Sequence, residues 1–176
     1  MNWVIRSAVA ADAAELSKLA EQTFRVAFSD LNTPENMDLH CSSSYSTSIQ
    51  AAEIVNPAVD TIVAESQGRL VGFAQMHFDP DSPDCVTLAP SVELRRIYVD
   101  RSFHGTGLAH DLMARVLQTA AIHDSEALWL GVWEQNPRAI RFYGRLGFSE
   151  VGDHAFLLGN DPQRDLIMVR RLRTSQ

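Results

Sequence analysis

The feature that most constrains this chain is a two-glycine turn between a predicted β-strand and a long amphipathic helix. From Leu108 onward, apolar residues recur every three or four positions for about four turns, which predicts a helix with one buried face. The strand is expected at residues 92–99, and the turn contains Gly105 and Gly107. Such a helix start offers unpaired backbone N–H groups and a partial positive charge, and glycines leave room for an anion. The segment therefore predicts a cradle for a diphosphate or, as the alternative, an ordinary strand-to-helix turn that needs glycine.

Strand and helix patterns alternate along the chain, without a repeat, a low-complexity segment or a linker. A length of 176 residues suits one domain, residues 1–176, of the α/β (α+β layered) class. Strands are expected at residues 3–6, 61–65, 70–78, 92–99, 127–132, 148–158 and 165–171. Helices are expected at residues 13–28, 34–43 and 48–55, from 108 for about four turns, and from 137 to just before 147. Turns or loops are expected at residues 66–69, 79–84 and 159–162.

Capping residues mark where these helices begin and end. Asp12 followed by Glu15 has the spacing of a capping box. Thr33 and Asn136 each precede a proline, an order typical of an N-cap before the first helical position. Gly147 fits the left-handed position that follows a helix C-terminus.

Charge and composition exclude several classes of partner. The formal net charge of −7 at pH 7 disfavours nucleic acid or an anionic membrane as the main partner. No apolar run approaches the ~20 residues of a membrane span, and the N-terminus lacks the features of a signal peptide, so a cytoplasmic location is expected. Cys41 and Cys85 lie far apart, outside any C-x-x-C or His-rich setting, which argues against a metal site or a redox pair. Two free thiols are the favoured interpretation, with one disulfide as the alternative.

Two blocks of sequence together resemble the GNAT superfamily of N-acetyltransferases. The first is similar to the family's phosphate loop, Gln/Arg-x-x-Gly-x-Gly/Ala, with histidine in place of the usual glutamine or arginine; it consists of His104, Gly105, Thr106, Gly107, Leu108 and Ala109. The second, residues 128–148, resembles the family's Asn-x-x-Ala-x-x-x-Tyr followed by Gly-Phe, and it contains Asn136, Ala139 and Tyr143. The blocks have the expected order and separation, and the likeness runs from about residue 60 onward and more loosely through the N-terminal helices.

The resemblance implies a GNAT fold, with a central mixed, mostly antiparallel sheet of about six to seven strands flanked by about four helices. It implies acetyl-CoA as co-substrate, an amine as acetyl acceptor, no metal, and direct attack without an acyl-enzyme. Backbone groups of Ile97, Tyr98 and Val99 would hold the pantetheine amides, and the loop would hold the pyrophosphate. Asn136 would bind the pantetheine arm or the phosphate region, and Ala139 would leave room for the arm. Candidates for further phosphate contacts, with a solvated surface position as the alternative for each, are His104, Arg138 and Arg145.

The resemblance also suggests the groups that move protons. Tyr143 is the predicted general acid, because a phenol with a pKa near ~10 can protonate a departing thiolate; a core aromatic is the alternative. Glu93 is the predicted base, directly or through water, since it lies on the strand before the loop. The alternative for Glu93 is an exposed strand carboxylate or an ion-pair partner of Arg95 or Arg96.

A narrower resemblance points to the bacterial spermidine/spermine acetyltransferases. It rests on residues 31–35 and 154–168 and on the pair Trp133-Glu134, and it implies a polyamine acceptor. Trp133 and His154 are candidates to line the acceptor site, with a core or hairpin role as the alternative. Acidic residues that could steer a polycation, or simply form a charged surface, are Asp30, Glu35, Asp38 and Glu134.

Two other functions remain open from the sequence. One is acetylation of a protein N-terminus or a lysine side chain. The other is a non-catalytic domain that binds or senses acyl-CoA, against which the presence of Tyr143 and Glu93 argues. A homodimer is also compatible with the sequence, although no segment indicates an interface.

Overall fold

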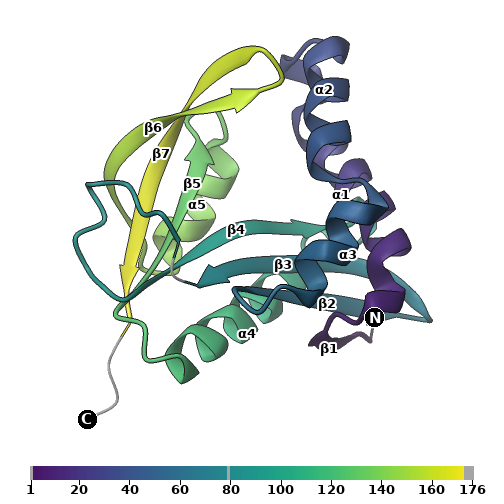
Figure 1. Ribbon diagram of the computed structural model, residues 1–176, viewed down its shortest axis with the longest axis horizontal. Helices are drawn as coiled ribbons and strands as arrows, with labels where there is room; N and C mark the ends of the chain where they lie inside the picture. The colour runs from purple at the N-terminus through teal and green to yellow at the C-terminus, as the bar shows by residue number, and fades with distance from the viewer. Residues whose placement is uncertain (1, 79, 173–176) are drawn as a thin grey trace.

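Seven strands form one mixed sheet in the computed structural model, which describes residues 2–78 and 80–172 (Figure 1). The strand order is β1-β2-β3-β4-β5-β7-β6, in which β4 and β5 are parallel and all other neighbours are antiparallel. The strands are β1 (Val4–Ser7), β2 (Val59–Ser66), β3 (Arg69–Phe78), β4 (Ser91–Val99), β5 (Ala127–Trp133), β6 (Ser149–Leu158) and β7 (Asp161–Arg171). The α-helices are α1 (Ala13–Phe28), α2 (Pro34–Ser44), α3 (Thr47–Val55), α4 (Leu108–Ile122) and α5 (Pro137–Arg145). The predicted mixed, mostly antiparallel sheet is confirmed, and the described part of the chain has five α-helices rather than about four.

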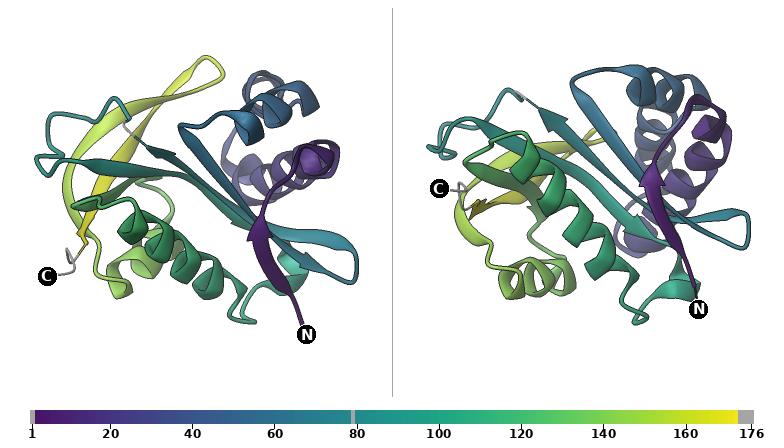
Figure 2. Two further views of the ribbon diagram at one scale, coloured as in Figure 1. Left: turned by 60° about the horizontal axis from the view of Figure 1, so that its bottom comes forward. Right: turned by 90° about the horizontal axis from the view of Figure 1, so that it is seen from below.

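Helices cover both faces of the sheet. α1, α2 and α3 lie over one face, and α4 and α5 lie over the other (Figure 2). Successive residues of a central strand face opposite layers: Ile62 of β2 packs in the core with α4, and Val63 packs in the core with α1. Leu112 of α4 and Leu16 of α1 are fully buried in these two cores. Burial of each such side chain stabilises the fold by about 1.5–3 kcal/mol.

The strands β4 and β5 separate after a short parallel stretch. They pair only between residues 91–93 and 127–129. Arg95 is an extra residue in β4, left between the paired residues Leu94 and Arg96, and such a β-bulge bends its strand. β5 meanwhile pairs along its whole length with β7. The ends of β4 and β5 therefore diverge, as Figure 1 shows, and they leave an edge of each strand facing the other.

Three of the four predicted caps are confirmed. Thr33 Oγ1 accepts a hydrogen bond from the Asn36 N–H at 3.3 Å, and Asn136 Oδ1 accepts one from the Ala139 N–H at 3.1 Å. Gly147 has φ +84°, the left-handed conformation expected after α5.

The capping box predicted at Asp12 is wrong. The Asp12 carboxylate accepts from the Val9 N–H at 2.8 Å and pairs with Arg6 of β1 at 2.7 Å, so it makes no cap bond to α1. Glu15 accepts from the Leu70 N–H at 2.8 Å instead of reaching back to Asp12. Both carboxylates are used in tertiary contacts, which the local spacing does not contain.

The other boundaries lie within two residues of those predicted, except at the start of β7. This strand begins at Asp161 rather than at residue 165, so Pro162 lies inside it. Pro162 faces Leu157 of β6, whereas β5 reaches β7 only from Asp165 onward. A strand with one neighbour tolerates a proline, because the missing N–H can lie on the unpaired side.

Both cysteines are free thiols, with Cys41 buried and Cys85 half-buried, so the disulfide alternative is excluded. Within residues 2–78 and 80–172, no group of three or more His, Cys, Asp or Glu side chains is arranged to hold a metal ion. None of the helices in the same part of the chain is long and apolar enough to cross a membrane.

Candidate functional site

Two cavities adjoin the diverging ends of β4 and β5. We call the larger, of about 650 Å³, the loop cavity, because it lies against the turn before α4; its lining includes Val99, Asp100, His104, Gly105, Ala109 and Arg138. We call the smaller, of about 380 Å³, the aromatic cavity; its lining includes Phe24, Tyr45, Arg96, Trp133, Phe156 and Asp165. Residues that border both cavities are Phe28, Ile97, Tyr98, Asn136, Ala139 and Tyr143. Both volumes lie in the range of about 300–1,000 Å³ typical of small-molecule sites, and the shared residues form a junction between them.

The loop cavity brings together most of the residues predicted to bind the coenzyme. Those that line it are Ile97, Tyr98, Val99, His104, Gly105, Ala109, Asn136, Ala139 and Tyr143. Thr106, Gly107 and Leu108 do not line it. The Thr106 hydroxyl donates to a backbone carbonyl of its own turn at 2.7 Å, and the Leu108 side chain is fully buried in the core. From these three positions, only backbone groups are placed to act on a ligand.

The turn before α4 requires its two glycines. Gly105 and Gly107 have φ +78° and +99°, in the left-handed region that side chains rarely adopt. A Cβ at either position would meet no atom beyond its chain neighbours within 4 Å, so the space beside them is open. The N–H groups of Leu108 and Ala109 occupy the first two positions of α4 and have no acceptor within the helix. An anion placed here would meet free N–H groups and the positive end of a 15-residue helix.

His104 connects the end of β4 to α5. Its Nε2 lies 3.1 Å from the carbonyl oxygen of Val99, and its Nδ1 lies 3.4 Å from Arg138 Nη1. The neutral tautomer with the proton on Nε2 satisfies both contacts, since Nε2–H then donates to Val99 and Nδ1 accepts from Arg138. Arg138 and Arg145 both line the loop cavity, where their guanidinium groups can meet anionic oxygens.

The end of β4 has one free edge. Residues 97–99 pair with β3 on one side, whereas pairing with β5 stops at Glu93. Backbone N–H and C=O groups on that edge can therefore bind an extended ligand as an added strand would. The Tyr98 ring packs 6.3 Å from the Phe24 ring, measured between their centres, and burial raises the pKa of the Tyr98 hydroxyl to about 12.

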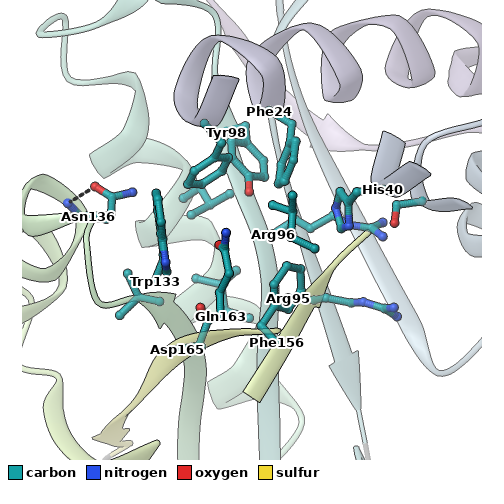
Figure 3. A pocket seen from close by; sticks show the side chains of 18 of the residues that line it. Phe24, His40, Arg95, Arg96, Tyr98, Trp133, Asn136, Phe156, Gln163 and Asp165 are labelled. Atoms are coloured by element: carbon teal, nitrogen blue, oxygen red, sulfur yellow. Dashed lines mark hydrogen bonds between the residues drawn. The ribbon is translucent and has the colours of Figure 1, made fainter. Parts of the chain in front are cut away.

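The first turns of α5 place Asn136, Ala139 and Tyr143 at the junction of the two cavities. The side-chain oxygen Oδ1 of Asn136 accepts the capping hydrogen bond from the Ala139 N–H, drawn as the dashed line in Figure 3. The side-chain N–H₂ group of Asn136 therefore remains available. Ala139 adds little bulk beside it. Tyr143 is only 9% exposed and packs 5.7 Å from the Phe148 ring. Burial, and secondly the nearby Tyr98, raise the pKa of Tyr143 above its usual value, so this phenol is protonated at neutral pH.

Aromatic rings and one satisfied guanidinium form much of the aromatic cavity (Figure 3). The His40 ring stacks on Phe24 at 4.4 Å, and burial together with the charge of Arg96 lowers the pKa of His40 to about 4. Arg96 lies 5.1 Å from the centre of the Tyr45 ring and pairs with Glu53 at 2.8 Å. His40 is thus neutral at physiological pH, and the charge of Arg96 is already compensated.

Glu93 does not line either cavity. It lies in the stretch of β4 that pairs on both sides, before the strands diverge, and its burial raises the pKa of its carboxyl. The alternative ion-pair role is not found in the described part of the chain either, because Arg96 pairs with Glu53 and Arg95 lies 3.0 Å from His77.

Other predicted acceptor-site residues are divided between the cavities and the surface. Trp133 lines the aromatic cavity, and the ring of His154 lies beside Gly131, which also lines it. Of the four acidic residues, Asp38 pairs with Arg25 at 2.7 Å and Glu134 with Arg164 at 2.9 Å. The aromatic cavity is not lined by any of the four acidic residues, Asp30, Glu35, Asp38 and Glu134.

Asp165 lines the aromatic cavity but was not a candidate site residue, although it lies in the segment 154–168 on which the narrower resemblance rests. It lines the aromatic cavity from β7, as Figure 3 shows. Its cross-strand partners are Trp133 of β5 and His154 of β6. Burial raises the pKa of its carboxyl to about 6. The resemblance of this segment does not single out Asp165, and only the pairing of β7 with both neighbours reveals its position at the cavity.

The geometry agrees with comparisons to known proteins. Residues 15–148 match the Acetyltransferase (GNAT) family. An uncharacterized N-acetyltransferase of Mycobacterium tuberculosis strain H37Rv is 35% identical over 92% of this chain and 98% of that protein. The spermine/spermidine N(1)-acetyltransferase of Bacillus subtilis is 28% identical over 74% of this chain and 90% of that protein. The crystal structure of the PaiA N-acetyltransferase from Thermoplasma acidophilum in complex with coenzyme A has the same fold, with a TM-score of 0.81, 19% identity and coverage of 97% of this chain and 99% of that one.

The family match spans well over half of the chain, and the fold, the glycine turn and the open edge of β4 agree with it. Together they establish both the fold class and the reaction class that the sequence predicted. The chain belongs to the GNAT family and is an acetyl-CoA-dependent N-acetyltransferase.

Proposed function

We propose that acetyl-CoA occupies the loop cavity, that a primary amine occupies the aromatic cavity, and that the acetyl group crosses at the junction beside Tyr143. The observation that carries this proposal is the set of residues shared by both cavities, which includes Tyr143, Asn136 and Ala139. A diphosphate at the turn before α4 would meet N–H groups and the arginines Arg138 and Arg145. The pantetheine arm would then follow the free edge of β4 toward Tyr143.

The transfer proceeds by direct attack in this proposal. The acceptor arrives as an ammonium and loses one proton, and its nitrogen lone pair then attacks the thioester carbonyl carbon. When the C–S bond breaks, the thiolate takes the Tyr143 proton, and the second nitrogen proton leaves as the amide forms and restores the phenol through solvent. One proton is released overall for each amide and free thiol produced.

The polyamine acceptor predicted from the sequence finds support in the named activity of the Bacillus subtilis relative. That support comes from similarity rather than from the cavity, so spermidine belongs in the test panel as one candidate among several amines. A cytoplasmic location and a homodimer also remain predictions from the sequence.

The test measures thiol release from acetyl-CoA with Tyr143→Phe and the wild type. A positioned general acid contributes about 10²–10⁴-fold, so kcat should fall by about 10²-fold or more. Acetyl-CoA affinity and thermal stability should stay close to wild type, because the ring remains packed against Phe148. An unchanged kcat across the pH range would remove Tyr143 from the mechanism.

A further inference from the structure

One carboxylate borders the aromatic cavity among the described residues, and it belongs to Asp165. The other ionisable side chains of that lining are those of His40, Arg95 and Arg96, beside its tyrosines. No hydrogen bond or ion pair to the Asp165 carboxylate is formed by any group within residues 2–78 and 80–172. A half-buried carboxylate without a partner is costly to keep, so its position at a cavity calls for a cationic ligand.

A missing side chain on β5 makes room for this carboxylate. Gly131 of β5 lines the aromatic cavity, and a Cβ built on it would lie 3.3 Å from Asp165 Oδ2 and 3.2 Å from His154 Nε2. Asp165 and His154 are cross-strand partners in the β6–β7 hairpin. The carboxylate of Asp165, which belongs to β7, thus lies against the backbone of β5. β5 is the strand that faces β4 where the two strands diverge.

The charged and titratable groups around Asp165 are either neutral or already paired, so the Asp165 carboxylate is the group that can bind a cation. From β6, His154 is half-buried, and burial lowers the pKa of its ring, which favours the neutral form. From β4, Arg96 is paired with Glu53, and Tyr98 is a protonated phenol. Further groups are neutral His40 on α2, Arg95 on β4 beside His77, and Arg164 on β7, which points to Glu134 and Asp153.

The rest of the cavity fits an apolar body rather than a second charge. Phe24, Phe28, Trp133 and Phe156 line it, and its volume is about 380 Å³. A second ammonium of a bound polyamine would lie among these rings and the two arginines of β4, without another carboxylate. Desolvating that second charge without a counter-ion would cost more than leaving it in water.

Building on the proposed function, we infer that the acceptor is a primary amine with one cationic centre and an apolar, preferably aromatic, body, and that Asp165 binds its ammonium. The ammonium then lies beside the junction with Tyr143, and the carboxylate accepts the proton that the nitrogen loses before it attacks the thioester. The aromatic rings hold the body of the amine. Asp165 thereby takes the place predicted for Glu93.

The experiment compares 2-phenylethylamine, hexylamine and spermidine as acceptors for the wild type and for Asp165→Asn, with acetyl-CoA saturating. With the wild type, kcat/KM for 2-phenylethylamine should exceed that for spermidine about tenfold. Asp165→Asn should lower kcat/KM for 2-phenylethylamine at least 100-fold and leave acetyl-CoA affinity unchanged. Asp153→Asn is the matched control, because it removes an exposed carboxylate from the same hairpin and lies outside both cavities.

Gly131→Ala provides a second variant that keeps the carboxylate but moves it. The added Cβ would press on Asp165 Oδ2 at 3.3 Å, so kcat/KM for the amine should fall several-fold while acetyl-CoA affinity stays intact. A wild-type preference below threefold, or an Asp165→Asn variant within threefold of wild type, overturns the inference. Acetylation of spermidine or of peptides alone overturns it too but leaves the proposed acetyl transfer standing, whereas no thiol release with any amine or peptide refutes both.

Discussion

Breaking the ion pair between Arg96 and Glu53 should lower the stability of the folded protein substantially. The two side chains are 8% and 15% exposed, and Arg96 Nη1 lies 2.8 Å from Glu53 Oε2. The same nitrogen donates to Gln75 Oε1 at 2.6 Å, and Glu53 Oε2 also accepts from the side-chain amides of Gln75 and Gln50 at 3.1 and 3.2 Å. One carboxylate thus joins α3, β3 and β4 behind the wall of the aromatic cavity.

Glu53→Gln keeps the shape of the side chain and removes its charge. The Arg96 guanidinium would stay buried without a counter-ion, and breaking a buried pair in this way costs about 3–5 kcal/mol. The lower end applies here, because the Gln75 carbonyl and the Tyr45 ring at 5.1 Å still face the cation. A loss of about 3 kcal/mol corresponds to a fall in Tm of roughly 6–12 °C for a chain of this size.

Thermal and urea unfolding followed by circular dichroism would measure the effect. The matched control is Glu21→Gln, which breaks the exposed i,i+4 pair with Arg25, where the two side chains are 46% and 35% exposed. Such a pair contributes only about 0.3–0.5 kcal/mol, so the control should lie close to wild type. If Glu53→Gln costs less than about 1 kcal/mol, the pair is solvated in solution and the reasoning from burial is refuted.

Two further variants test the two cavities separately. Gly107→Trp should abolish acetyl-CoA binding in calorimetry, because a side chain at φ +99° strains the turn and the ring would fill the open space beside it; unaltered affinity would place the coenzyme elsewhere. For Asp165, a pKa raised from 3.8 to about 6 means that the folded protein holds this proton more tightly than the unfolded chain, so stability is lost as pH rises through that window. Asp165→Asn removes this loss, and its Tm should exceed that of wild type above pH ~6 and match it below pH ~4, whereas a lower Tm at pH 8 would contradict the sign.

Local signals in the sequence predicted most of the fold. The apolar spacing after Leu108 and the caps at Thr33 and Asn136 depend on neighbours within one helix, and the structure confirms them. Asp12 failed as a cap because Arg6, on a separate strand, competes for the same carboxylate. Proline inside β7 could not be predicted either, since its tolerance depends on which strand lies beside it.

The two cavities of the candidate site also differ in how far local sequence signals could predict them. The loop cavity is lined by the end of β4, the turn before α4, the first turns of α5 and the C-terminal part of α1. Sequence motifs mark the first three of these segments, but they do not indicate the contribution of α1. The aromatic cavity is lined by residues of α1, α2, α5, β4, β5, β6 and β7, and which residues meet there depends on strand register. Glu93 lies on the predicted strand but lines neither cavity, because β4 is still paired with β5 at this residue; no sequence pattern reveals where that pairing ends or that Arg95 forms a bulge.

Of the charged side chains that line the aromatic cavity, Arg96 stabilises the ligand-free protein and Asp165 destabilises it. Arg96 has Glu53 and Gln75 as partners, whereas the ionised Asp165 carboxylate is partly desolvated and has no partner among the described residues. An ammonium that binds Asp165 would remove that cost and stabilise the folded state by linkage. In a thermal-shift assay at pH 8 with coenzyme A present, 2-phenylethylamine should therefore raise the Tm of the wild type and leave that of Asp165→Asn nearly unchanged. Equal shifts for both proteins would mean that the amine binds without the carboxylate, and the stored electrostatic cost at Asp165 would then need another explanation.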